Sequence, residues 1–461
     1  MWRRVGIVVL VAVAVACGGP DPVSTGIGAD APEHSSVDSS TTELPATTPS
    51  PTTTARPTTT SSIEPVEQPG VRVPSTTQEL SIPDDPSSAN PLPESDSPYQ
   101  AALVGFGDDE PTFDPEPLQP FVDLTELPTG WAAFDFFLAD ALLRNGNTAA
   151  SVAVSIGGEI VHRAAIGERA PLPVDAAEPQ DRFRIASISK TLTAITLLGL
   201  VEDGIVGLDE PIGRRVAEHV GLTSSPASIE AITPRHLLNH TAGFGKYRTV
   251  FFGGGADDCT DAARIGLDRS PSSNPGGTYR YSNMNYCVAG ELIEALTGND
   301  YDDEVYARVL TPLGISGPRL AATFDPGPDE ILHPTTLGRN YMETLGGAGG
   351  WIATPADLVA VLDALDPSTT GHTLLTPETL EMMKTPVNGQ RGQRGYGLGL
   401  LLYGGDRYGH TGTIEATHAM AMNRGDGVTW AITVSGPYPD DTPRLESIIN
   451  RAFEAGGFVT T

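Results

Sequence analysis

The sequence predicts an α/β (α+β) fold: an antiparallel sheet with terminal helices on it and an inserted helical lobe. Two strand-like segments come early, at residues 149–155 and 159–165, and strand-like segments return only near the end, at residues 399–403, 415–422 and 428–434. The long stretch between them is mainly helical. A sheet must bury one face against another layer, so we expect both ends of the folded region to build one sheet.

The first elements are a helix and a hairpin. Residues 131–144 have the pattern of an amphipathic helix, which ends at Asn145-Gly146. The two early strands flank Gly157-Gly158, a pair typical of a tight hairpin turn.

The middle of the chain is organised around residues 183–204, FRIASISKTLTAITLLGLVEDG. Apolar residues recur at steps of three and four from Ser187 onward, which predicts a buried helix, and Asp203-Gly204 is a typical helix end. Thr233-Pro234 predicts the start of a short helix, because proline suits the first helical position. Further helices are expected at 290–297, 355–365 and, closing the chain, 444–455.

The N-terminal quarter has a different composition. Residues 1–16 resemble a signal peptide, with Arg3-Arg4 before an apolar run too short to span a bilayer as a helix. Cys17 follows in a context that favours lipidation, and ordinary secretion after a cleavage at Ala16 is the alternative. Residues 17–98 form an acidic linker rich in Ser, Thr and Pro, and 99–127 a transition segment. The folded domain is expected at 128–458.

The formal net charge of −30 limits the partners of this protein. An acidic surface disfavours nucleic acid and anionic membranes as ligands. We therefore expect no nucleic-acid partner, and a membrane attachment only through a lipid on Cys17. The localisation that follows is the outer face of the cytoplasmic membrane, or the medium if Cys17 is not lipidated. The sequence leaves the oligomeric state open.

Ser187 and Lys190 are the strongest candidates for catalysis. Positions i and i+3 share a face of a helix, so the hydroxyl and the amine are expected to meet. A serine hydroxyl becomes a good nucleophile when a neighbouring base takes its proton. The structural alternative is a serine at a helix start with a solvated lysine, but a charge is unusual on a helix this apolar.

Two later segments are candidates to complete this site. Tyr281 is expected to relay or accept a proton if the charge of Lys190 lowers its pKa, and Asn283 to hydrogen-bond Lys190 and a substrate amide. His410, Thr411 and Gly412 precede a strand-like run that starts at Thr413. At a sheet edge, the Thr413 N–H group is expected to form an oxyanion hole with that of Ser187.

The other histidines and the remaining two cysteines are interpreted as structural residues. His236 and His240, four residues apart in a helical pattern, lack the glutamate and third ligand of a zinc site, and His418 fits a buried strand. We therefore expect no metal. Cys259 and Cys287 form a possible disulfide, which the sequence neither requires nor excludes.

The ordered motifs S-x-x-K (Ser187, Lys190), Y-x-N (Tyr281, Asn283) and H-T-G (His410, Thr411, Gly412) resemble the serine β-lactamase/penicillin-binding protein family. The similarity is strongest to the branch of class C β-lactamases and D-alanyl-D-alanine carboxypeptidases and esterases. Segments such as ITPRHLLNHTAGF and LGGAGGWIATPADLVAVL resemble this family as well. The resemblance covers about residues 136–453 and implies the three-layer β-lactamase/transpeptidase-like fold.

The resemblance also implies roles for the candidate residues. Ser187 corresponds to the acylated nucleophile, Lys190 to its activating amine, Tyr281 to a proton shuttle and Asn283 to a clamp on the substrate amide. No cofactor is implied. The expected function is an exported D-alanyl-D-alanine carboxypeptidase-like hydrolase of cell-wall peptides. The alternatives are a carboxylesterase or β-lactamase on small substrates, or a non-catalytic lipoprotein that binds peptidoglycan or penicillin.

One position departs from many family members. His410 stands where many β-lactamases and carboxypeptidases have a lysine that binds a substrate carboxylate. Histidine is mostly uncharged near neutral pH. The departure therefore disfavours efficient β-lactam hydrolysis.

Overall fold

The computed structural model describes residues 128–171, 174–369 and 373–458. The predicted signal peptide, Cys17, the linker and the transition segment lie outside the described residues. Within the described ranges, no helix is both long enough and apolar enough to cross a bilayer.

Strands from both ends of the described region form one eight-stranded sheet, as predicted. Its order is β3-β2-β1-β11-β10-β9-β8-β7, and neighbouring strands are antiparallel. The early strand β1 (Ala149–Ile156) pairs directly with the last strand, β11 (Val428–Ser435). The other strands are β2 (Glu159–Pro171), β3 (Val174–Ala176), β7 (Arg394–Tyr396), β8 (Leu401–Gly404), β9 (Arg407–Ile414) and β10 (Thr417–Asn423). The predicted fold class is confirmed.

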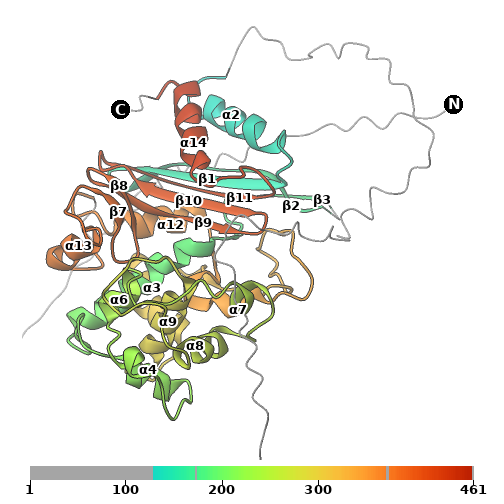
Figure 1. Cartoon of the computed structure of the whole chain (residues 1–461). Helices are drawn as coiled ribbons and strands as arrows, with labels where there is room; N and C mark the ends of the chain where they lie inside the picture. The colour runs from blue at the N-terminus through green and yellow to red at the C-terminus, as the bar shows by residue number, and fades with distance from the viewer. Residues whose placement is uncertain (1–127, 172–173, 370–372, 459–461) are drawn as a thin grey trace, which may run out of the picture. The chain divides into compact units, whose positions relative to one another are not determined.

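Two helices cover one face of this sheet. They are α2 (Trp131–Leu143) and α14 (Arg444–Ala455), both at their predicted places, and they lie side by side above the sheet in Figure 1. Phe134 and Ile449 on these helices pack with Trp430 and Met420 of the sheet in one buried cluster. Burial of these side chains stabilises the layer by about 1.5–3 kcal/mol each.

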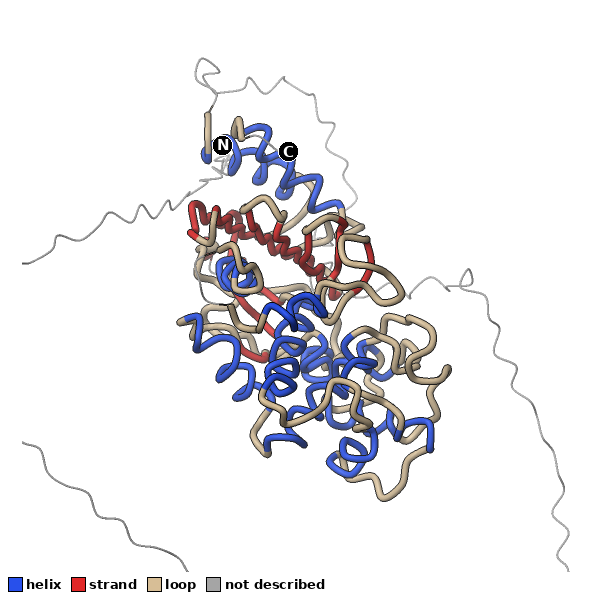
Figure 2. The backbone as a smooth tube through the Cα atoms, turned by 90° about the vertical axis from the view of Figure 1, so that its left-hand side faces the viewer, coloured by secondary structure: helices blue, strands red, loops and turns tan. Residues whose placement is uncertain are grey.

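The opposite face carries α12 (Pro355–Asp363), α3 (Ser189–Glu202) and the helical lobe. Figure 2 shows helices on both sides of the strands. The lobe contains α4 (Gly213–His219), α5 (Ala227–Glu230), α6 (Pro234–Leu238), α7 (Arg248–Phe252), α8 (Cys259–Leu267), α9 (Asn283–Thr297) and α10 (Tyr301–Val305), followed by η2 (Tyr306–Leu310), η3 (Thr311–Leu313), α11 (Tyr341–Leu345), η4 (Gly346–Ala348) and, after α12, α13 (Pro377–Met383). A single large apolar core joins this lobe to the inner face of the sheet.

The central helix α3 begins two residues later than the pattern predicts. The chain enters through β4 (Phe183–Arg184), which pairs with β6 (Trp351–Ala353), itself paired with β5 (Arg319–Leu320). It then makes the 3₁₀ turn η1 (Ala186–Ile188). Ser187 therefore lies in this turn, directly before α3, and Lys190 lies in the first turn of α3.

Two other boundaries differ from the predictions. Helix α9 begins at Asn283 rather than near residue 290, because the Ser282 hydroxyl caps it by accepting the Met284 N–H at 3.2 Å. The run predicted to start at Thr413 is two strands, β9 and β10, separated by a turn in which Glu415 has a positive φ of 47°. His410, Thr411 and Gly412 therefore lie within a strand, not before one.

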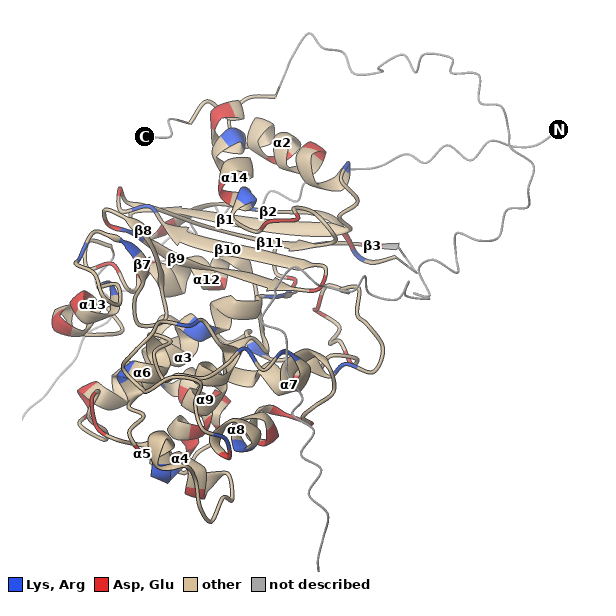
Figure 3. Cartoon of the chain, in the orientation of Figure 1, with Lys and Arg blue, Asp and Glu red and all other residues tan. Residues whose placement is uncertain are grey.

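Charged residues avoid the middle of the sheet. Neither β10 nor β11 contains Asp, Glu, Lys or Arg. Figure 3 shows acidic residues, coloured red, on helices such as α8 and α13. Lys190 on α3 is 0 % exposed, and a lysine so completely buried requires an explanation.

Candidate active site

The site is built where η1 meets β9. Ser187 is partly exposed, while Ile185 and Ala186 before it are fully buried. Ala186 has a φ of +48°, a conformation that costs free energy for a residue with a side chain. Strain of this kind persists where the surrounding packing holds it, so Ser187 is presented on a backbone turn that the fold fixes.

Lys190 connects three separate segments of the chain. Its Nζ atom lies 3.0 Å from Ser187 Oγ, 2.9 Å from Asn283 Oδ1 and 2.6 Å from the carbonyl oxygen of Ala348. Asn283 is the first residue of α9, and Ala348 is the last of η4. The i, i+3 contact with Ser187 and the hydrogen bond to Asn283 are those that the sequence motifs predict.

These contacts suit a neutral amine. Burial lowers the pKa of Lys190 well below its ordinary value. The Ala348 carbonyl and the Asn283 amide oxygen are acceptors only, so a neutral amine donates its two N–H groups to them. Its lone pair is then left for the Ser187 hydroxyl, which is the arrangement of a general base.

Tyr281 adjoins the same pair. Its ring centroid is 5.0 Å from Lys190 Nζ, and its hydroxyl hydrogen-bonds Ser187. Burial raises the pKa of Tyr281 above its ordinary value, and the hydrogen bond with Ser187 offsets only part of this effect. The condition that the charge of Lys190 lowers this pKa is therefore not met, because burial raises it. Tyr281 is a neutral phenol at neutral pH, so it is able to donate or relay a proton but is a poor base.

Strand β9 brings the third motif to Ser187. Its pairing with β8 ends at Gly409, so residues 410–414 are paired on the β10 side only. A Cβ atom on Gly412 would lie 2.2 Å from the Ile185 carbonyl oxygen and 2.9 Å from Ala186 Cβ. Only glycine allows this approach, which places the backbone of β9 against η1. The predicted sheet edge therefore exists over only part of β9. The strand lies inside the sheet, but residues 410–414 have no partner strand on the β8 side.

His410 lies in this strand but does not face solvent. It is 1 % exposed, its Nε2 is 3.1 Å from Tyr396 Oη, and its Nδ1 is 2.6 Å from the Thr411 carbonyl oxygen. The carbonyl only accepts, so Nδ1 carries the proton and Nε2 accepts from Tyr396. Burial, followed by the charge of Lys190, lowers the pKa of His410 to about 3. His410 therefore supplies no cation for a substrate carboxylate. Of its neighbours, Thr411 is partly exposed, and Thr413 is exposed and hydrogen-bonds Thr442.

Residues 138–452 match the family model described as Beta-lactamase. The chain belongs to the Beta-lactamase family. The family named from the motifs is therefore confirmed, and the fold is that of β-lactamases and transpeptidases.

Three relatives illustrate the range of proteins to which this chain is similar. "Penicillin-binding protein 4" of Amycolatopsis lactamdurans is 28 % identical, over 62 % of this chain and 80 % of that protein. "Esterase EstB" of Burkholderia gladioli is 30 % identical, over 38 % of this chain and 48 % of that protein. The solved structure of a D-stereospecific amidohydrolase from Streptomyces sp. has a TM-score of 0.55 and 26 % identity, over 70 % of this chain and 98 % of that chain. The chain thus spans only about half of the esterase, and 37 % of "Penicillin-binding protein 4*" of Bacillus subtilis.

Sequence reasoning missed two contributors to the site. The first is the carbonyl of Ala348, a backbone group that no side-chain pattern reveals, although the Gly-rich segment LGGAGG around it is a signal of close backbone approach. The second is His240, which was expected on a helix with His236. Helix α6 instead ends at Leu238, and His240 has a φ of +60°.

His240 lies beside Tyr281, with ring centroids 4.3 Å apart. Its Nδ1 accepts hydrogen bonds from the Asn285 side chain at 2.9 Å and the Ser282 N–H at 3.4 Å. It thus holds the start of α9, which carries Asn283. His236 serves a different purpose, because it forms a capping box with Thr233 at the start of α6.

The remaining candidates lie away from Lys190. Cys259 and Cys287 are joined in a disulfide that ties the first residue of α8 to α9. His418 is buried, and its Nδ1 is 3.3 Å from the Thr442 hydroxyl oxygen, as suits a structural residue.

The lowered pKa of Lys190 predicts an acid limb in the pH–rate profile. The neutral amine is the active form, so the rate of acylation is full above the folded-state pKa of Lys190 and falls as the pH drops through it. His410 remains neutral down to about pH 3 and adds no second limb at milder pH. Single-turnover acylation from pH 4 to 9 measures this profile. A rate that rises as the pH falls would contradict it.

Proposed function

We propose that this protein is a serine hydrolase that cleaves an amide or ester carbonyl through an acyl-enzyme on Ser187. The observation that carries the proposal is the buried Lys190 amine. It contacts two oxygens that only accept hydrogen bonds, and its third contact is Ser187 Oγ. A buried amine in this position has no structural purpose that an apolar side chain would not serve better. Catalysis explains why the fold accepts the free-energy cost of burying this amine.

The contacts support the following sequence of steps. Ser187 Oγ forms a bond to the substrate carbonyl carbon while Lys190 Nζ takes the hydroxyl proton. The N–H groups of Ser187 and Thr413 stabilise the oxyanion, an effect typically of about 3–4 kcal/mol for one donor. Tyr281 passes a proton to the leaving amine or alkoxide, and Lys190 replaces it. Water then attacks the acyl-enzyme by the same proton path in reverse, which releases the acid and restores Ser187.

The proposed substrate is a peptide or amide with a D-amino acid at the scissile bond, as in D-alanyl-D-alanine peptides. The likeness to the D-stereospecific amidohydrolase and to the penicillin-binding protein, which the chain matches over most of their lengths, supports this class. The neutral, buried His410 favours carboxylesterase activity as the second candidate, because no cation there demands a carboxylate on the substrate. The shorter match to the esterase agrees with it.

A labelling experiment tests the enzyme itself. Wild-type protein is incubated with a fluorophosphonate probe and with a fluorescent penicillin, in parallel with Ser187→Ala. The expected result is an adduct of one probe per chain by intact mass, absent from Ser187→Ala. Ser189→Ala is the matched control, because Ser189 is a buried neighbour two residues away. Absence of any Ser187-dependent adduct would refute the serine hydrolase and leave the non-catalytic binder.

Rates on three substrates then separate the classes. We expect D-alanyl-D-alanine peptides to be cleaved faster than p-nitrophenyl esters, and nitrocefin to be turned over least. A preference for the esters would favour the carboxylesterase instead. Export and lipidation of Cys17 stay predictions from the sequence.

A further inference from the structure

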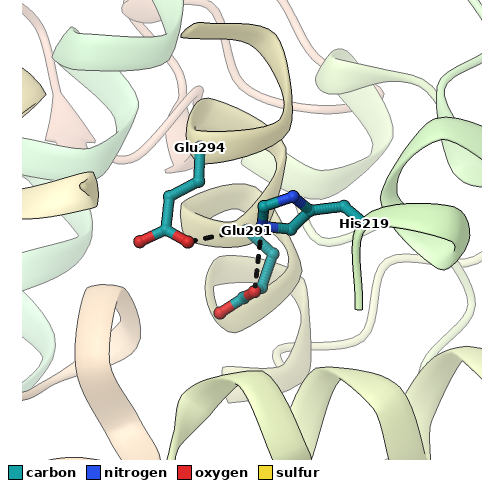
Figure 4. A group of neighbouring side chains, drawn as sticks. All are labelled: His219, Glu291 and Glu294. Carbon is teal, nitrogen blue, oxygen red and sulfur yellow. Dashed lines mark hydrogen bonds and ion pairs between the residues drawn. The ribbon is translucent and has the colours of Figure 1, made fainter. Parts of the chain in front are cut away.

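A second group of side chains with metal-binding chemistry lies in the helical lobe. His219 is the last residue of α4, and Glu291 and Glu294 lie on one face of α9, three residues apart. Figure 4 shows the three side chains converging from the two helices. Glu291 is eight residues from Asn283, about 12 Å along the helix axis, so this group is separate from the site around Ser187.

The distances within the group suit a metal ion. His219 Nε2 is 3.3 Å from Glu294 Oε2 and 3.6 Å from Glu291 Oε2. One ligand atom from each residue lies within 4.8 Å of the others. Bonds of about 2.0–2.2 Å from zinc to nitrogen and oxygen in a tetrahedron give ligand–ligand separations of about 3.3–3.6 Å. Two of the three distances between the ligand atoms, those from His219 Nε2 to the two carboxylate oxygens, already lie in this range.

The two carboxylates are held by the protein on one side only. Thr260 Oγ1 donates to Glu291 Oε1 at 2.9 Å, and the Tyr301 N–H donates to Glu294 Oε1 at 3.0 Å. The other oxygen of each, Oε2, points to the imidazole. Hydrogen bonds of this kind orient ligands in metal sites.

Glu291 gives the second, independent indication. Its side chain is only 6 % exposed, and its buried Oε2 has no hydrogen-bond partner. Such an atom is costly to bury unless a cation satisfies it.

A protonated His219 is the competing explanation, and it is the poorer fit. One imidazolium nitrogen would have to serve two carboxylates, and 3.6 Å to Glu291 Oε2 is too long for a hydrogen bond. His219 and Glu294, with side chains 31 % and 29 % exposed, give an ion access from solvent.

We propose that His219, Glu291 and Glu294 bind one divalent transition-metal ion of the Zn²⁺ type, with water in the fourth position. The ion links α4 to α9, the helix that begins with Asn283. Its role is structural.

The test uses the full chain, purified without a histidine tag and stripped with a chelator. Titration calorimetry with ZnCl₂ measures binding, and thermal unfolding with and without Zn²⁺ measures stabilisation. We expect one equivalent to bind and the unfolding temperature to rise by a few degrees when free Zn²⁺ is about 100-fold above its Kd. Mg²⁺, which prefers all-oxygen sites, should bind more weakly.

Two variants test the ligands, and a third serves as the control. His219→Ala and Glu294→Gln should each weaken Zn²⁺ binding by at least about tenfold and abolish the thermal shift. Glu218→Gln is the matched control, because it removes one negative charge from an exposed residue next to His219 and should bind as the wild type does. Stoichiometric binding that persists in both His219→Ala and Glu294→Gln, or no binding by the wild type, would overturn the proposal. Circular dichroism of the metal-free proteins shows whether each variant is folded.

Discussion

Replacing Lys190 by alanine should slow acylation of Ser187 by about 10²–10⁴-fold, the range of general-base catalysis. The physical reason is that the amine is the basic group 3.0 Å from Ser187 Oγ, while Tyr281, with its raised pKa, cannot replace it at neutral pH. Burst kinetics with a p-nitrophenyl ester and intact mass after incubation with a penicillin measure the acylation step.

The matched control is Lys246→Ala, since Lys246 is an exposed lysine. It should acylate at the wild-type rate. Lys190→Ala also leaves the Asn283 amide oxygen and the Ala348 carbonyl without their hydrogen-bond donor, which lowers the stability of the fold. Circular dichroism and a melting curve must therefore accompany the kinetics. A folded Lys190→Ala protein with full acylation would show that the amine is not the activating base.

Gly412→Ala should reduce acylation by about 10²-fold, because the new Cβ atom would lie 2.2 Å from the Ile185 carbonyl oxygen. Backbone cannot rotate away as a side chain does, so β9 has to move from η1. That movement separates the Thr413 N–H group from the Ser187 turn. The decrease should appear in the acylation rate constant for both esters and peptides, as expected for loss of oxyanion stabilisation.

Gly199→Ala is the control for adding a methyl group. Gly199 lies in α3, and a Cβ there would meet only the Arg308 side chain, at 3.6 Å. It should leave acylation unchanged and raise the free energy of unfolding by about 0.5–1 kcal/mol, because alanine is a better helix former. If Gly412→Ala acylates normally, β9 does not contribute to the oxyanion site as proposed.

The predictions from sequence succeeded where local pattern decides the outcome. Helices α2 and α14 have their predicted ranges to within a residue, because helical periodicity and end signals are local. They failed at two boundaries that depend on local features which the pattern of apolar residues does not mark. The start of α9 depends on the Ser282 cap, and the separation of β9 from β10 depends on a turn at Glu415 that no glycine or proline marks.

The sequence by itself determined the fold class, the family and the pairing of Ser187 with Lys190, because helix geometry places residues three apart on one face. Only the tertiary structure decided the state of these groups. Burial by other segments of the chain depresses the pKa of Lys190, raises that of Tyr281 and lowers that of His410, which is therefore neutral. The tertiary structure also places His219 next to Glu291 and Glu294. Desolvation and convergence depend on what surrounds a residue in space, and a linear pattern does not carry that information.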